Sequence, residues 1–129
     1  MNNKTLESLL VEANDQIKRL SYEETVTKTQ NSNHVIIDVR EESEVAFSGL
    51  IKNAINIPRG VIEFKLKPGS LENPIPIDAD TNILLYCAAG FRAALAAKSL
   101  EDSGFHNVFN IGGFGEWVSN GGEIETSLK

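Results

Sequence analysis

Hydrophobic residues follow a helical spacing at the start of the chain. Apolar side chains recur there at intervals of three and four residues, with charged side chains between them, which predicts an N-terminal amphipathic helix over residues 1–20. Ser21 and Glu24 then form the sequence signature of a capping box, in which the side chain of each residue binds the backbone N–H of the other. This pair predicts a second helix from Tyr22 to Gln30, at the start of a core domain that spans residues 21–129.

Further along the chain, consecutive apolar residues predict strands that are buried on both faces. These runs lie at Val35–Val39, Ala54–Pro58, Asn82–Cys87 and Val108–Ile111. Helices are predicted at Glu41–Phe47, Gly60–Leu66, Phe91–Ser103 and Glu116–Asn120, with a loop over Lys67–Thr81 and a glycine turn over Gly112–Gly115. The alternation predicts an α/β fold with a mostly parallel sheet, whose ligand site lies at the carboxyl ends of the strands.

Composition narrows the class of protein. The 129 residues fit one domain, and 41% of them are hydrophobic, which is enough to build a core. A net charge of −6 without any basic run argues against nucleic-acid binding, because phosphate backbones require clustered lysine and arginine. No apolar run approaches the roughly 18 residues of a membrane span, and the first residues lack the features of a signal peptide. We therefore expect a cytoplasmic protein that does not bind membranes.

Cys87 is the one cysteine of the chain, and it stands where a predicted strand meets a predicted helix. A free cysteine is often a buried, inert hydrophobe, and that is the alternative to a chemical role. Its position favours the chemical role, because the end of a strand displays a side chain and the next residues, Ala88, Ala89 and Gly90, are small. Successive N–H groups of such a loop converge on one point and form a nest for negative charge.

Arg92 lies in the first turn of the predicted helix, where the helix dipole disfavours a cation by ~0.3–1 kcal/mol. Either Arg92 is an ordinary surface residue, or it closes the loop by pairing with a carboxylate and helps to hold an anion. We predict the second role, with Asp38 as the partner, although Asp38 alone would suit a turn or a helix cap. Four residues separate Cys87 from Arg92, whereas cysteine phosphatases have five, and the tighter loop favours sulfur over phosphate.

The remaining candidate residues predict no metal site and no cofactor. His34 and His106 have no cysteine or acidic partner at metal-binding spacing. A catalytic pair of Cys87 and His106 is a minor alternative, because the two residues could meet in space. The later glycines do not follow the first strand as a dinucleotide-binding motif requires.

Taken together, several segments resemble the rhodanese family of sulfurtransferases. They are Ile37–Glu41, Asn53–Gly60, Tyr86–Arg92, Gly104–Val108 and Gly112–Trp117, in the order found in that family. The resemblance implies three layers, in which helices cover both faces of a five-stranded sheet whose first strand is near Leu20–Ser21. It implies that Cys87 accepts a sulfane sulfur, with Asp38, Arg40 and Arg59 in support and with the N–H groups of Ala88, Ala89, Gly90, Phe91 and Arg92 around the sulfur. The donor would be thiosulfate or a persulfide, and the acceptor would be cyanide or a thiol, either small or protein-bound.

The chain departs from this family next to the cysteine. Many thiosulfate-using members have a charged or polar residue there, whereas this chain has Ala88 and Ala89. Loss of a charge-assisted hydrogen bond costs about 1.5–3 kcal/mol, so we predict weak thiosulfate turnover, with Arg59 as the remaining cation for the donor. Two alternatives are a non-catalytic binding module of the same fold and a cysteine phosphatase or arsenate reductase, the latter disfavoured by the loop length.

Overall fold

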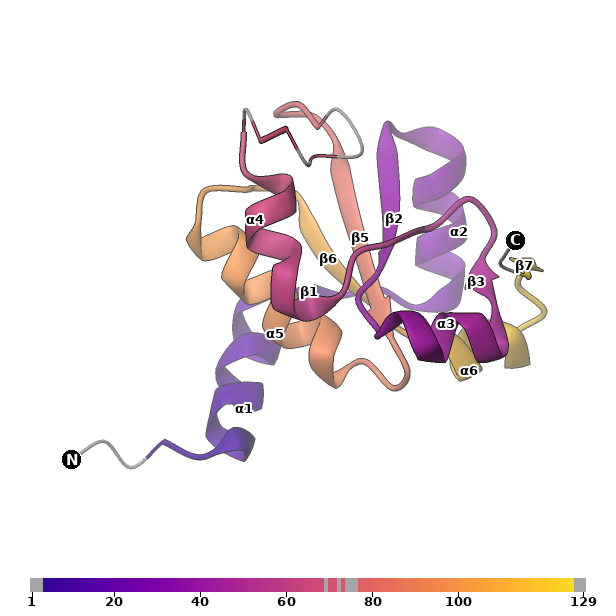
Figure 1. Cartoon of the computed structure of the whole chain (residues 1–129), viewed down its shortest axis with the longest axis horizontal. Helices are drawn as coiled ribbons and strands as arrows, with labels where there is room; N and C mark the ends of the chain where they lie inside the picture. The colour runs from indigo at the N-terminus through magenta and orange to yellow at the C-terminus, as the bar shows by residue number, and fades with distance from the viewer. Residues whose placement is uncertain (1–3, 69, 72, 74–76, 127–129) are drawn as a thin grey trace.

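Five parallel strands form the central sheet in the computed structural model, which describes residues 4–68, 70–71, 73 and 77–126 (Figure 1). The strands lie in the order β1-β6-β5-β2-β4, and each neighbouring pair is parallel. In that order they span Lys18–Arg19, Val108–Gly113, Asn82–Cys87, His34–Asp38 and Ile55–Asn56. The predicted α/β fold with a five-stranded parallel sheet is confirmed.

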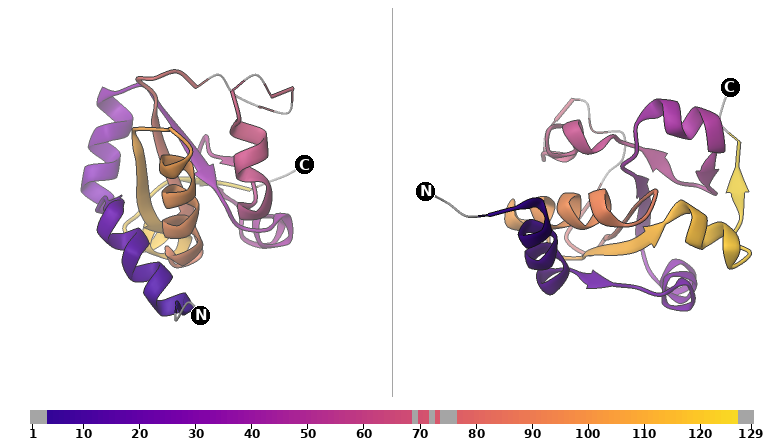
Figure 2. Two further views of the ribbon diagram at one scale, coloured as in Figure 1. Left: turned by 90° about the vertical axis from the view of Figure 1, so that its left-hand side faces the viewer. Right: turned by 90° about the horizontal axis from the view of Figure 1, so that it is seen from below.

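Helices cover both faces of this sheet. Figure 2 shows α2 and α5 on opposite sides of it. The helices are α1 (Leu6–Gln16), α2 (Tyr22–Asn31), α3 (Glu42–Ser48), α4 (Ile62–Leu66, entered through a short 3-10 turn over Arg59–Val61), α5 (Phe91–Asp102) and α6 (Phe114–Ser119). None of the described helices has the length and apolar composition needed to cross a membrane.

The central strands carry apolar side chains on both faces, because successive residues of a strand point in opposite directions. Ile37 and Leu85 pack into the cluster that includes residues of α4 and α5. Ile36 and Leu84 pack into the second cluster, on the opposite face. Two covered faces explain why these strands appear in the sequence as continuous apolar runs.

The capping box predicted for α2 is present, since the Ser21 N–H donates to Glu24 at 2.8 Å and the Glu24 N–H donates to Ser21 Oγ at 3.0 Å. The helix predicted over residues 1–20 is too long, because α1 ends at Gln16. Residues 1–3 of that prediction lie outside the described residues. The chain then becomes extended, and Lys18–Arg19 pairs with β6, two residues earlier than the strand expected near Leu20.

The predicted glycine turn over Gly112–Gly115 is wrong. Strand β6 continues through Gly113, and α6 begins at Phe114. A register shift lets Gly112 pair with Tyr86 and Gly113 with Cys87, with Gly112 at a φ of 98°. A Cβ on Gly113 would lie 2.3 Å from the carbonyl oxygen of Ala88, so glycine allows β6 to pack directly against the Cys87 loop.

A second, antiparallel sheet pairs β3 (Leu50–Ile51) with β7 (Ile124–Glu125). Sequence reasoning did not predict it, because two-residue strands are too short to show an alternating pattern. Several residues of the predicted loop over Lys67–Thr81 lie outside the described residues.

Candidate active site

Cys87 is the last residue of β5, and the loop that leads into α5 folds around its sulfur. The backbone N–H groups of Gly90 and Ala93 donate to Sγ at 3.0 and 3.4 Å. The side chain is only 1% exposed and belongs to the apolar cluster that includes α5. The prediction of a displayed thiol is therefore wrong, because the loop that brings its N–H groups to the sulfur also covers it.

The outer side of the loop consists of small or apolar residues. Ala88 and Ala89 are exposed, and Phe91 is 63% exposed. Gly90 has a φ of 99°, a left-handed conformation that an alanine would adopt only with strain, and this residue turns the chain into α5. The loop thus presents backbone donors inward to the sulfur and uncharged side chains outward.

Asn110 holds the loop from the neighbouring strand. Its side-chain amide donates to the Gly90 carbonyl at 3.1 Å, and its Oδ1 accepts the Gly112 N–H at 2.8 Å. Asn110 is buried in β6, and sequence reasoning missed it. The sequence did contain one indication of this role, a polar residue inside an apolar strand. Such a residue is buried with the strand, and a buried amide needs hydrogen-bond partners.

Arg92 pairs with Glu44 of α3, and the prediction of Asp38 as its partner is wrong. Nη1 and Nη2 donate to the two carboxylate oxygens of Glu44 at 2.6 and 2.9 Å. This hydrogen bonding is the main cause that lowers the pKa of Glu44 to about 2 and raises the pKa of Arg92. Both groups are therefore charged at neutral pH, and each neutralises the other.

Asp38 is bound instead to Arg40, two residues further on. Nε and Nη2 of Arg40 donate to the Asp38 carboxylate at 2.7–3.0 Å, and Nη2 also reaches the Gly49 carbonyl at 2.7 Å. Both side chains are buried, and the guanidinium lies 4.5 Å from the centre of the Phe114 ring. These contacts connect the end of β2 to the end of α3 and to α6, so the pair stabilises the surroundings of the loop.

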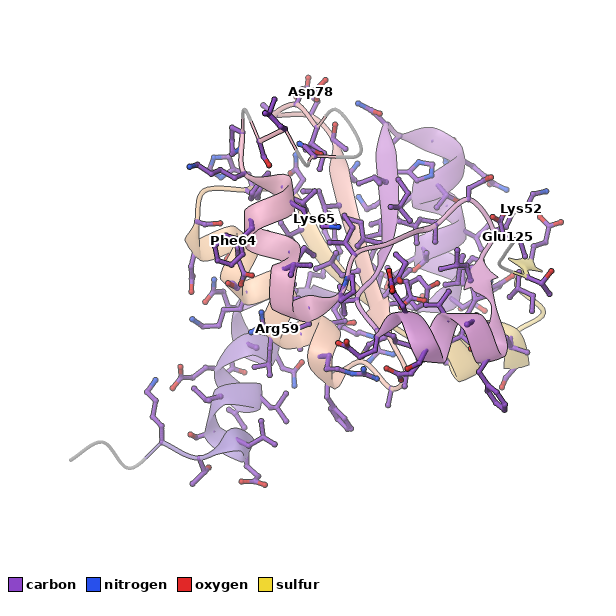
Figure 3. The ribbon with its side chains drawn as sticks, in the orientation of Figure 1. Lys52, Arg59, Phe64, Lys65, Asp78 and Glu125 are labelled. Carbon is purple, nitrogen blue, oxygen red and sulfur yellow. The ribbon has the colours of Figure 1, made fainter. Side chains whose placement is uncertain are left out.

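Arg59, the third supporting residue predicted from the sequence, lies where the chain enters α4 (Figure 3). Its Nη1 forms an ion pair with Glu63 at 3.2 Å, and Ser99 of α5 donates to the same carboxylate oxygen. Arg59 also lines a hollow with Leu9 and Leu95. Its described polar contacts thus connect α4 to α5 rather than to the Cys87 loop.

Arg19 lies against the Cys87 loop, and sequence reasoning did not identify it. Its guanidinium comes from β1, and Nη1 is 3.7 Å from the position of a Cβ on Gly90. The same guanidinium forms an ion pair with Glu116 of α6. Only the position of β1 beside β6 brings Arg19 here, and no sequence pattern indicates it.

Neither histidine can act on Cys87. His34 begins β2 beside Asn82, and His106 precedes β6, so both lie at the amino edge of the parallel sheet. Cys87 lies at the carboxyl edge, and the six residues of β5 separate the two edges by roughly 17 Å at about 3.3 Å per residue. The alternative of a Cys87–His106 catalytic pair is excluded. Among the described residues, no group of three or more potential metal ligands occurs.

Comparisons with known proteins agree with this arrangement. A family model described as the rhodanese-like domain matches residues 21–120. A sulfurtransferase from Allochromatium vinosum is 30% identical over 88 residues, which cover 67% of this chain and 74% of that protein. A tRNA uridine(34) hydroxylase from Prochlorococcus marinus is 33% identical over 86 residues, which cover 65% of this chain but only 27% of the hydroxylase. A solved structure from Rhodopseudomonas palustris, a protein of unknown function described as a possible tyrosine phosphatase, superposes with a TM-score of 0.86 at 35% identity and covers 97% of both chains.

The matched region begins at the N-cap of α2 and ends just after α6. It contains every strand of the main sheet except β1, together with the whole Cys87 loop. The chain therefore belongs to the family of rhodanese-like domains.

Proposed function

We propose that this protein is a sulfurtransferase that carries a sulfane sulfur as a persulfide on Cys87. The main support is the pair of backbone N–H groups, from Gly90 and Ala93, that donate to Sγ. Such donors stabilise negative charge on sulfur without adding a cation. The family and the sulfurtransferase relative from Allochromatium vinosum support the same chemistry.

The reaction is a double displacement. The Cys87 thiolate attacks the outer sulfur of the donor, a new S–S bond forms, and the leaving group departs with the electron pair of the bond that breaks. An acceptor thiolate, or cyanide in an assay, then attacks the outer sulfur of the persulfide and restores the Cys87 thiolate. The chain has one cysteine, so no internal disulfide can release the sulfur and the acceptor comes from another molecule.

A phosphatase is the second candidate, because the similar structure from Rhodopseudomonas palustris is described as a possible tyrosine phosphatase. The loop argues against it here. Four residues separate Cys87 from Arg92, and two of the loop N–H groups already lie at the sulfur itself. Hydrolysis of a small aryl phosphate, lost in Cys87→Ser, would support the phosphatase instead.

A non-catalytic binding module is the alternative from another class. A binding module would not require a thiol at the carboxyl edge of the sheet whose sulfur accepts hydrogen bonds from two backbone N–H groups. We also propose that residues 1–129 act as one domain, because α1 packs against α5. We propose the cytoplasm as the compartment of the protein, because a lone thiol stays reduced there.

The test is the mass of the intact protein after exposure to cysteine persulfide, glutathione persulfide and thiosulfate. We expect one added sulfur in the wild type, removed by excess thiol or by cyanide with release of thiocyanate. Cys87→Ser is the control and should stay unmodified. A wild-type protein that gains no sulfur from any of the three donors contradicts the proposal.

A further inference from the structure

Every arginine of this chain is neutralised by a carboxylate. The sequence contains four arginines, all of them among the described residues. Thiosulfate, a sulfur donor with two negative charges, would need an unpaired cation close to Cys87. The two arginines nearest the loop are instead paired with carboxylates of α3 and α6. The four pairs are Arg19–Glu116, Arg40–Asp38, Arg59–Glu63 and Arg92–Glu44.

Glu44 is placed to balance the positive charge of Arg92. Its two oxygens accept both terminal nitrogens of the guanidinium, and Oε1 also accepts the backbone N–H of Glu41 at 3.0 Å. Glu44 therefore caps α3 while it holds Arg92, which fixes the carboxylate in one position. Arg92 directly precedes Ala93, whose N–H donates to Sγ at 3.4 Å, so the guanidinium extends from the same turn that surrounds the sulfur.

We propose that Glu44 determines the choice of sulfur donor, and this inference rests on the sulfurtransferase function proposed above. By pairing with Arg92, Glu44 removes the cation that would bind the sulfonate of thiosulfate. Ala88 and Ala89 supply no charge in its place. The site thereby discriminates against thiosulfate and favours persulfides, whose leaving groups are thiolates.

The two half-reactions differ in the charge that must be accommodated at the loop. With thiosulfate, the Cys87 thiolate takes the outer sulfur and the S–S bond of the donor breaks, so that sulfite leaves with the electron pair and two negative charges. With cysteine persulfide, the same attack releases a cysteine thiolate, whose ammonium and carboxylate cancel and whose sulfur carries one charge. A free Arg92 would assist the first departure more than the second.

The experiment compares kcat/KM for thiosulfate and for cysteine persulfide, with cyanide as acceptor, in wild type and Glu44→Gln. The glutamine keeps an oxygen to accept the Glu41 N–H but carries no charge, so α3 keeps its cap. We expect thiosulfate kcat/KM to rise about 10- to 100-fold, the range for one new charge-assisted hydrogen bond, with a change of less than threefold for cysteine persulfide.

Matched controls separate charge from structure. Asp102→Asn removes the ion-pair partner of Lys98 and changes the net charge by the same amount as Glu44→Gln. Asp102 lies about 15 Å from Arg92 along α5, at 1.5 Å per residue. This variant should leave the ratio of thiosulfate to cysteine persulfide kcat/KM unchanged. In the double variant Glu44→Gln/Arg92→Gln, the gain with thiosulfate should disappear. The ratio of the two kcat/KM values should then equal that of the wild type, because the ion pair and the two glutamines that replace it both carry no net charge.

An unchanged ratio of thiosulfate to cysteine persulfide kcat/KM in folded Glu44→Gln overturns the inference, as does a tenfold fall of that ratio below the wild-type value in Glu44→Gln/Arg92→Gln. The second result remains available even if Glu44→Gln does not fold. Either result leaves the sulfurtransferase proposal intact as long as persulfide forms on wild-type Cys87. Failure of every donor to modify the wild type would instead refute the proposed function itself.

Discussion

Replacement of Gly113 by alanine is expected to disturb the Cys87 loop from the neighbouring strand. A Cβ on Gly113 would lie 2.3 Å from the Ala88 oxygen and 2.9 Å from both the Ala88 carbonyl carbon and the Ala89 Cα. The backbone of Gly113 is extended, with φ −117° and ψ 154°, so alanine meets no conformational strain there. The clash alone sets the cost, and it is with backbone atoms that no rotamer change can move.

The magnitude follows from the cost of inserting a methyl group into a packed site, about 1–3 kcal/mol. An unfolding entropy of roughly 2.1 cal/mol/K per residue gives about 270 cal/mol/K for 129 residues. The Tm should therefore fall by about 4–11 °C, as measured by circular dichroism. Because the atoms that must shift belong to the loop around Sγ, the fraction of Cys87 converted to persulfide should fall as well.

Gly115→Ala is the matched control. Gly115 lies two residues further on, inside α6, and a Cβ there meets nothing within 4 Å. Alanine is favoured over glycine in a helix by up to about 1 kcal/mol, so this variant should be as stable as wild type or more stable. A Gly113→Ala protein with a wild-type Tm and wild-type persulfide formation would refute the close approach of β6 to the loop.

Three further predictions concern the groups around the site. Asp38→Asn leaves the buried guanidinium of Arg40 without its counter-ion, so urea denaturation should show a loss of about 3–5 kcal/mol, and a loss below 1 would contradict the role of this pair. Tyr86→Phe removes the buried hydroxyl that accepts the Ile51 N–H at 2.9 Å, and the same measurement should show a loss of about 1–3 kcal/mol. Hydrogen bonds from Arg92 lower the pKa of Glu44 from its ordinary 4.5 to about 2, so its stabilising contribution is complete above pH 4.5 and disappears as the pH falls toward 2. Denaturation of Glu44→Gln across this range should show a shallower loss of stability with acid than wild type, and parallel curves would contradict the assignment.

Much of the fold follows from local features of the sequence. Ser21 and Glu24 start α2 through hydrogen bonds within one helical turn, and such bonds depend only on residue type and spacing. The apolar run of β5 predicts a strand covered on both faces, and its end correctly places Cys87 at the carboxyl edge of the sheet. The two-residue strands β3 and β7 escape prediction because their pairing brings together segments that are distant in the chain.

The sequence by itself determined the α/β class, the position of the thiol and the number of residues in its loop, because periodicity, capping and spacing are local properties. Only the tertiary structure decided that the thiol is buried and that Glu44, rather than Asp38, holds Arg92. Asp38 is taken by Arg40, and the packing of α3 brings a different acid to the loop. Ion pairing depends on distance and on burial, and residues far apart in the chain acquire both only when the elements pack together.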